Sequence, residues 1–80
     1  MTAQWQDATS GHELRIEDDL EACILNMGGS FNWSIGRRED GRTLFIRGGS
    51  CFDREEARRA ANNAITEHRA MLAEIQAMDL

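Results

Sequence analysis

The sequence contains no proline and no lysine, and each absence narrows what the chain can do. Without proline, no helix is interrupted by a residue that lacks a backbone N–H group. All nine basic residues are arginine, and 14 acidic residues leave a net charge of −5. Phosphate backbones are usually bound by basic domains, so this charge argues against broad nucleic-acid binding. It suits a basic protein partner.

Membrane-length apolar runs and paired cysteine motifs are also missing. No uninterrupted apolar stretch approaches the length that spans a membrane, and no lysine-rich leader precedes an apolar run. The two cysteines, Cys23 and Cys51, lie 28 positions apart and form no CxxC pair. A secreted domain of 80 residues is expected to hold more cysteines. We therefore expect a reduced, cytoplasmic protein without a membrane partner.

The strongest pattern is a capped helix from Asp53 to Met78. Asp53 can accept free N–H groups of the first turn, and Glu56 stands three residues later, as in a capping box. Small or apolar residues recur every three or four positions. They are Ala57, Ala60, Ala61, Ala64, Ile65, His68, Met71, Leu72, Ile75 and Met78. This helix would be ~39 Å long, whereas a strand of about seven residues covers only ~23 Å.

A small sheet therefore cannot cover the whole apolar stripe. Its first half is rich in alanine and can approach the sheet closely near Trp33. The larger side chains of its second half need another cover, and a second copy of the chain, in a homodimer, is the expected one. The predicted dimer interface comprises His68, Met71, Leu72, Ile75 and Met78.

A β-hairpin is predicted around Asp40-Gly41, because this dipeptide favours a two-residue turn. The predicted cross-strand pairs are Glu39 with Arg42, Arg37 with Leu44, Ile35 with Ile46, and Trp33 with Gly48. One face then carries Phe31, Trp33, Ile35, Leu44 and Ile46. The other face carries Ser34, Gly36, Arg38, Thr43, Phe45 and Arg47.

Residues 12–29 (HELRIEDDLEACILNMGG) are compatible with two structures. As strands around a turn at 17–19, they place five apolar residues on one face, namely Leu14, Ile16, Leu20, Ala22 and Ile24. As a helix over 19–27, they use Asp18 as a cap and Glu21 to complete a capping box. Strands are favoured, because they extend the hairpin into a broader surface for the long helix.

The predicted fold class is thus α+β, an antiparallel meander of about four strands with one long C-terminal helix on its apolar face. The alternative is an αββα arrangement with the short helix at 19–27. Residues 1–11 are expected to form a flexible N-terminal arm, in which Trp5 either folds back over the core or moves freely. Residues 12–80 are expected to form a single domain.

No catalytic or metal-binding signature accompanies this fold. His68 lies inside the apolar stripe, where a core or interface histidine is expected rather than a catalytic base. Cys51 precedes the helix, where a thiol pKa can be lowered, but no histidine is near it in sequence. Together with His12 and Cys23, these residues lack the short spacing of a zinc site. We expect no enzyme, no metal and no cofactor.

The charged hairpin face and the acidic first half are the candidate binding surfaces. The predicted partner-binding residues are Arg38, Phe45, Arg47, Glu17, Asp18, Asp19 and Glu21. An apolar patch rimmed by charge is typical of a protein interface. Arginine beside an aromatic ring can also stack on bases or bind phosphates. Cross-strand pairing of these arginines with acidic neighbours is the plainer interpretation.

The run from Phe31 to Ile65 resembles small phage, prophage and bacterial proteins in which a meander precedes one helix. The matching elements are FNWSI, the DG turn, the glycine-rich connection and FDREEARRAANNAI. This last segment is also similar to the helix of HicB-type antitoxins. The resemblance implies a binding module and transfers no catalytic residue.

Size, acidity and the long apolar stripe together favour a non-enzymatic protein-interaction module. In a phage or mobile element, such a module is expected to inhibit a nucleic-acid-handling enzyme, in the manner of an anti-CRISPR protein. The alternative is a nucleic-acid-binding accessory domain that uses Arg38, Phe45 and Arg47. A small subunit of a larger enzyme is a third hypothesis.

Overall fold

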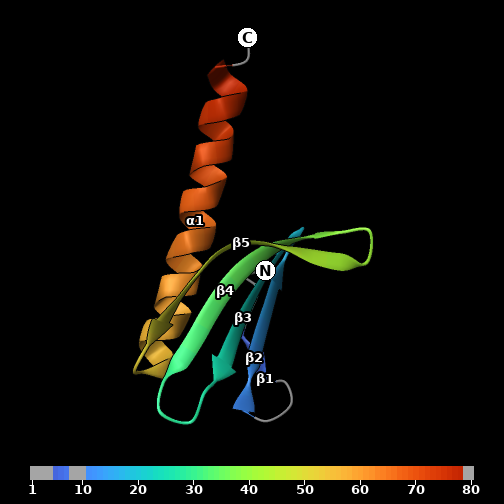
Figure 1. Ribbon diagram of the computed structural model, residues 1–80. Coiled ribbons are helices and arrows are strands. Elements are labelled where there is room, and N and C mark those ends of the chain that lie inside the picture. The colour runs from blue at the N-terminus through green and yellow to red at the C-terminus, as the bar shows by residue number, and fades with distance from the viewer. Residues whose placement is uncertain (1–4, 8–10, 79–80) are drawn as a thin grey trace.

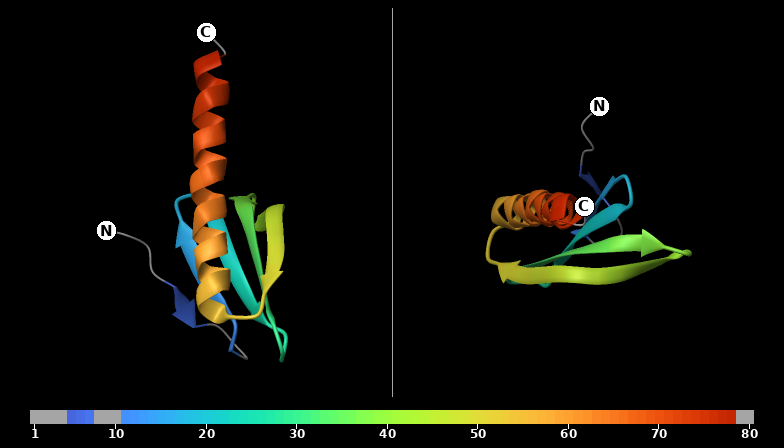
Figure 2. Two further views of the ribbon diagram at one scale, coloured as in Figure 1. Left: turned by 90° about the vertical axis from the view of Figure 1, so that its left-hand side faces the viewer. Right: turned by 90° about the horizontal axis from the view of Figure 1, so that it is seen from above.

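The computed structural model describes residues 5–7 and 11–78, which form five strands followed by one helix. The elements are β1 (Gln6–Asp7), β2 (Glu13–Glu17), β3 (Leu20–Asn26), β4 (Phe31–Glu39), β5 (Arg42–Cys51) and α1 (Arg54–Met78). Neighbouring strands pair antiparallel in chain order, and α1 lies on one face of the sheet (Figure 1, Figure 2). The predicted α+β meander with a C-terminal helix is confirmed. Because residues 20–26 form β3, the alternative helix at 19–27 is wrong.

The short strand β1 lies inside the segment that was predicted to be a flexible arm. Gln6 pairs with Leu14 and Asp7 with Glu13, so β1 adds a fifth strand beside β2. Trp5 packs against the hydrophobic core. Of the two alternatives for Trp5, the one in which it folds back over the core is therefore confirmed, whereas the prediction of a flexible arm is wrong for Gln6 and Asp7. Residues 1–4 and 8–10 of that arm lie outside the described residues.

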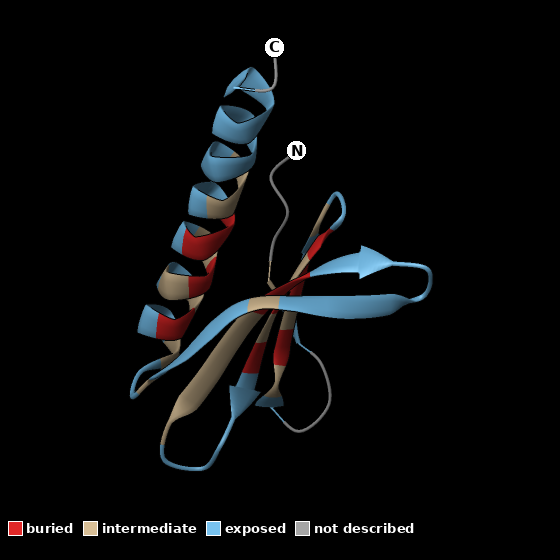
Figure 3. Cartoon of the chain, turned by 45° about the horizontal axis from the view of Figure 1, so that its top comes forward, coloured by how far each residue is buried: buried red, intermediate tan, exposed pale blue. Residues whose placement is uncertain are grey.

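The core forms where small side chains of α1 meet β3 and β4. Its buried members are Leu20, Ala22, Ile24, Ile35, Ala57, Ala61, Ala64 and Ile65. Alanine lets the helix axis approach the sheet closely, as the sequence predicts. Figure 3 shows that the buried part of α1 is its first half, whereas the second half is exposed. Trp33 and Ile46 pack at the border of this core.

The β4–β5 hairpin turns at Asp40-Gly41, where both residues have positive φ, 52° and 79°. This is the backbone geometry that the favoured two-residue turn requires, so the predicted turn is confirmed. The predicted pairs next to the turn are also confirmed, namely Glu39 with Arg42 and Arg37 with Leu44.

Farther from the turn, the register shifts at a β-bulge. Gly36 still pairs with Phe45, but Ile35 pairs with Arg47, which leaves Ile46 as the additional residue of β5. The predicted pairs of Ile35 with Ile46 and of Trp33 with Gly48 are therefore wrong, and Gly49 lies opposite Trp33 instead. A Cβ atom on Gly49 would lie 2.8 Å from the indole Nε1 of Trp33, so the ring needs a glycine at this position.

The bulge has two consequences for the molecule. A bulged strand bends and twists more strongly, and the far part of the hairpin, residues 37–44, leads away from α1 (Figure 1). The bulge also brings Arg47 to the helix side of the sheet, where its Nη1 lies 2.6 Å from Oε2 of Glu67 on α1. The prediction that Arg47 shares a face with Arg38 and Phe45 is therefore wrong.

The turn between β2 and β3 is one residue shorter than predicted. Glu17 pairs with Leu20, so only Asp18 and Asp19 form the turn, and Asp18 has a φ of 55°. A one-residue change of register moves every side chain of a strand to the other face. Leu14 and Ile16 were predicted to face the helix and instead lie on the opposite face of the sheet.

Polar residues of β2 therefore lie under the helix, where they meet polar residues of α1. Glu13 is 1% exposed and forms ion pairs with Arg58, at 2.6 Å, and with Arg54, at 3.1 Å. Farther along β2, Arg15 donates a hydrogen bond of 2.8 Å to Asn62, and Glu17 pairs with Arg69 at 3.6 Å. These contacts line one side of α1. We call them the β2–α1 polar ladder.

The Glu13 carboxylate should contribute more to stability than an exposed carboxylate in a similar ion pair. We expect Glu13→Ala to lower the free energy of unfolding by about 1–3 kcal/mol, because buried polar groups lose their partners. The matched control is Glu67→Ala, which removes a pair of the same length whose carboxylate is 64% exposed and should cost less than about 1 kcal/mol. Urea unfolding measures both values, and equal losses would contradict the role of burial.

Candidate functional site

The face of the sheet that points away from α1 is the largest candidate binding surface, and we call it the outer face. Strand pairing places on it Gln6, Leu14, Ile16, Glu21, Cys23, Leu25, Asn32, Ser34, Gly36, Arg38, Thr43, Phe45, Gly48 and Ser50. Among the described residues, no helix packs on this side (Figure 2). Several of its apolar side chains are exposed, including Ile16, Leu25 and Phe45.

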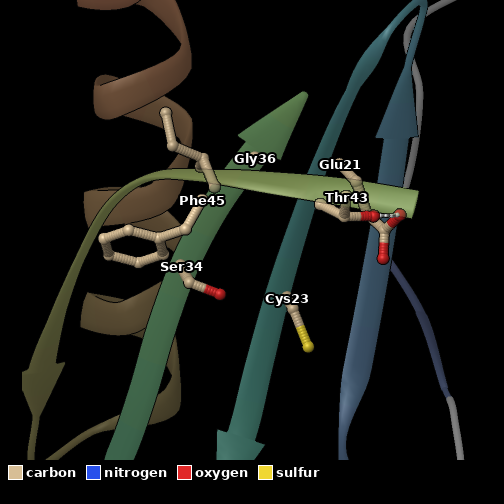
Figure 4. A pocket seen from close by; sticks show the side chains of 7 residues that line it. Glu21, Cys23, Ser34, Gly36, Thr43 and Phe45 are labelled. Carbon is tan, nitrogen blue, oxygen red and sulfur yellow. Dashed lines mark hydrogen bonds between the residues drawn. The ribbon is translucent and has the colours of Figure 1, made fainter. Parts of the chain in front are cut away.

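A hollow of about 120 Å³ lies near the centre of the outer face. Figure 4 shows Phe45 on one side of it and the Glu21–Thr43 pair on the other, with Ser34 and Cys23 between them. This volume is several times the ~10–15 Å³ that a single water needs, so a partner's side chain can enter. Gly36 lies in the wall of the hollow, where its missing Cβ avoids a 2.5 Å contact with Cγ2 of Thr43.

Phe45 stands between this hollow and a second, wider one. The second hollow has a volume of about 530 Å³ and continues along β4 and β5 past Gly48 and Gly49. A Cβ atom on Gly48 would lie 3.1 Å from Cε2 of Phe45, so glycine lets the ring lie against the backbone of β5. The ring nevertheless remains 72% exposed.

Glu21 organises the polar end of the outer face. Its Oε2 accepts a hydrogen bond of 3.0 Å from the Thr43 hydroxyl and lies 3.6 Å from Nε of Arg38. The backbone N–H of Arg38 donates to the carbonyl of Asp19 at 2.7 Å, which ties the acidic turn to this end of the sheet. The charges around the hollow are thus partly neutralised across strands, as the plainer interpretation of the sequence expects.

Cys23 is a half-buried free thiol that lines the hollow. Burial, followed by the negative charge of Glu21, raises the pKa of this thiol above its ordinary value. A raised pKa leaves less thiolate at neutral pH, which is the opposite of what a nucleophilic cysteine requires. The geometry of Cys23 therefore suits binding better than covalent chemistry.

The predicted partner-binding residues separate into three places. Arg38, Phe45 and Glu21 lie together on the outer face. Arg47 and Glu17 face the helix, and their partners there are Glu67 and Arg69. Asp18 and Asp19 are exposed in the turn that adjoins Arg38, and Asp18 also pairs with Arg69 at 3.3 Å.

The predicted dimer residues lie on one stripe of α1. Met71, Leu72, Ile75 and Met78 are exposed beyond the sheet, whereas His68 is half-buried at the point where the helix leaves it. His68 also lines a cavity of about 230 Å³ together with Arg37, Leu44, Phe45 and Ile46. The prediction of an uncovered second half holds for this chain, and the dimer itself stays a prediction.

Among the described residues, no three side chains of His, Cys, Asp or Glu gather as ligands for a metal ion. His12 is engaged by the backbone, because its Nδ1 accepts a hydrogen bond of 3.0 Å from the N–H of Asn26. Over residues 5–7 and 11–78, no helix has the length and apolarity needed to cross a membrane.

Comparisons of the chain with family models, with curated proteins and with solved structures find no match.

Several residues of these surfaces escape prediction from the sequence. Ser34 and Thr43 are expected on the hairpin face, but nothing in their spacing indicates a hollow. Leu14 and Ile16 join the outer face only because the Asp18-Asp19 turn is short. The alternation of charged residues in Glu13–Glu17 is a signal for the polar ladder, and the assumed turn length obscured it.

The pKa of Cys23 yields a prediction about its reactivity. In a Cys51→Ser background, Glu21→Gln should speed alkylation of Cys23 at about pH 8 by about two- to fivefold. Removing the carboxylate charge lowers the thiol pKa and raises the thiolate fraction, while burial still acts. The control is Glu39→Gln, which removes a carboxylate from the exposed hairpin tip. An unchanged or slower rate for Glu21→Gln would refute the assigned cause.

Proposed function

We propose that this chain is a non-enzymatic protein-binding module whose outer face binds a partner protein through Phe45. The observation that carries this proposal is an aromatic ring that is 72% exposed between two hollows on an uncovered sheet face. Aromatic side chains are enriched at protein interfaces, and a few of them supply most of the binding energy. The exposed Ile16 and Leu25 extend the apolar surface around this anchor.

Charge indicates the kind of partner. The chain has a net charge of −5, and the exposed Asp18 and Asp19 adjoin the outer face at Arg38. A partner with a basic surface and a protruding apolar side chain complements both features. Proteins that handle nucleic acids carry such basic surfaces. A module that covered such a basic surface would inhibit the nucleic-acid-handling enzyme that carries it. This is the role expected of such a module in a phage or mobile element.

Direct nucleic-acid binding is the weaker candidate. It requires Arg38, Phe45 and Arg47 to share one surface, but Arg47 faces the helix and pairs with Glu67. Arg38 pairs with Glu21, which reduces the positive charge near Phe45. The protein partner is therefore the better-supported proposal.

A variant pair on exposed phenylalanines tests the proposal. Immobilised wild-type chain, Phe45→Ala and Phe52→Ala are each exposed to a nuclease-treated lysate of the native host, and retained proteins are quantified by mass spectrometry. Phe52 is the matched control, because it is 87% exposed and lies outside both hollows. We expect one protein to be retained by the wild type and Phe52→Ala and lost with Phe45→Ala.

Titration of the purified partner then gives the size of the effect. Phe45→Ala should weaken binding about 30-fold, which corresponds to the ~2 kcal/mol typical of an interface anchor. Equal retention by both variants, or retention of no protein at all, would refute the proposal. Retention from an untreated lysate that disappears after nuclease treatment would favour the nucleic-acid alternative.

A further inference from the structure

The second half of α1 extends beyond the sheet with its apolar stripe exposed (Figure 1, Figure 3). The exposed stripe consists of Met71, Leu72, Ile75 and Met78. The residues between them are mostly alanine, glutamate and glutamine, which favour helix and let it propagate from the packed first half. The helix thus presents a formed apolar surface to solvent.

A cleft adjoins the start of this stripe. The hairpin arm, residues 37–44, bends away from α1, and the cavity of about 230 Å³ lies between the arm and the helix. His68 contributes the helix side of the cavity, while Leu44 and Ile46 contribute apolar groups from β5. Arg37 lies at its edge on β4 and is the basic residue among the cavity's lining groups.

His68 and three of the four stripe residues lie at positions that are symmetric about residue 73, whereas Leu72 has Glu74 as its counterpart. His68 and Met78 each lie five positions from Ala73, and Met71 and Ile75 each lie two positions from it. In an antiparallel pair of helices related by a two-fold axis at this level, His68 faces Met78 and Met71 faces Ile75. We propose that a second copy of the chain pairs in this way, and that Met78 of each copy enters the cavity beside His68 of the other.

The exposed stripe of α1 alone is too small for a standard interface, so the hairpin arm must also take part in the contact. The four exposed stripe residues are about half exposed on average, and at ~100 Å² each they supply ~400 Å², about half of the ~800 Å² per partner in a standard interface. A helix pair alone would therefore be small. Seating Met78 against Leu44 and Ile46 adds the arm to the contact.

The charges of the two copies are also complementary in this arrangement. The last turn of α1 carries no basic side chain. The carbonyl groups of this turn therefore have no positively charged side chain from the same turn beside them. The carboxyl end of a helix bears partial negative charge and favours a basic group. In the proposed pair this end approaches Arg37 of the second copy. Arg37 forms an exposed ion pair with Glu39, of a kind that contributes little to stability.

The pairing meets the outer-face anchor only at Phe45, which also lines this cavity, and its test changes Ile75 on the helix, so it can fail while the proposed function stands. Sedimentation velocity at micromolar concentration should show a dimer for the wild type and a monomer for Ile75→Asp. The matched control is Met27→Asp, which places the same charge at an exposed methionine that follows β3 and should leave the dimer intact. Circular dichroism confirms that each variant is folded. A monomeric wild type, or a dimeric Ile75→Asp, would overturn the proposal.

Cysteine cross-linking tests the antiparallel geometry. In a Cys23→Ser, Cys51→Ser background, the double variant His68→Cys, Met78→Cys should form a disulfide-linked dimer on mild oxidation. The two positions lie ~15 Å apart on one helix, too far for an intrachain disulfide. Met78→Cys alone should remain unlinked, because the proposed axis separates the two copies of this residue. Linking of Met78→Cys alone would indicate a parallel pair, and no linking of the double variant would exclude the antiparallel one.

Discussion

The close packing of the alanine-rich first half of α1 on β3 and β4 is the contact on which the rest of the structure depends. Ala61 and Ala64 are buried against Ala22 and Ile35, so small side chains on both sides bring helix and sheet together. This contact decides which face of the meander is covered. It also leaves two surfaces open, the outer face and the second half of α1.

The β2–α1 polar ladder shows how a small domain can seat charged residues under a helix. Glu13 is buried, but two arginines of α1 reach it from the solvent side, and these side chains are only about one-third exposed. Long arginine stems can cover apolar surface while the guanidinium groups stay near water. The ladder along one side of α1 and the Arg47–Glu67 pair on the other hold the helix at a defined position across the sheet.

The two open surfaces suit two separate roles. The outer face points away from the helix and presents Phe45, whereas the exposed stripe lies on the part of α1 that extends beyond the sheet (Figure 1). A pair of chains joined through α1 would leave the hollow between Phe45 and Glu21 open on both outer faces, while Phe45 would also line the cavity that receives Met78. Two linked copies of one binding face raise the effective concentration for a partner with two sites.

Some features of this protein follow from its sequence alone. The capped, proline-free run after Asp53 specifies the long helix, and Asp40-Gly41 specifies the hairpin turn. Both signals are local, and few alternative backbone structures suit these residues. Phe45 and Arg38 share a face for the same reason, since their positions are counted from that turn.

Other features were decided only by the tertiary structure. The number of residues in the Asp18-Asp19 turn sets which face of β2 meets the helix, and packing against α1 selects the register in which Glu13 finds Arg54 and Arg58. The bulge at Ile46 likewise arises where β5 must satisfy both the turn and the helix side of the sheet. Local sequence rules count residues along one strand, whereas these choices depend on distant partners that are met only in the folded chain, such as Arg58, which lies 45 positions from Glu13, and Glu67, which lies 20 positions from Arg47.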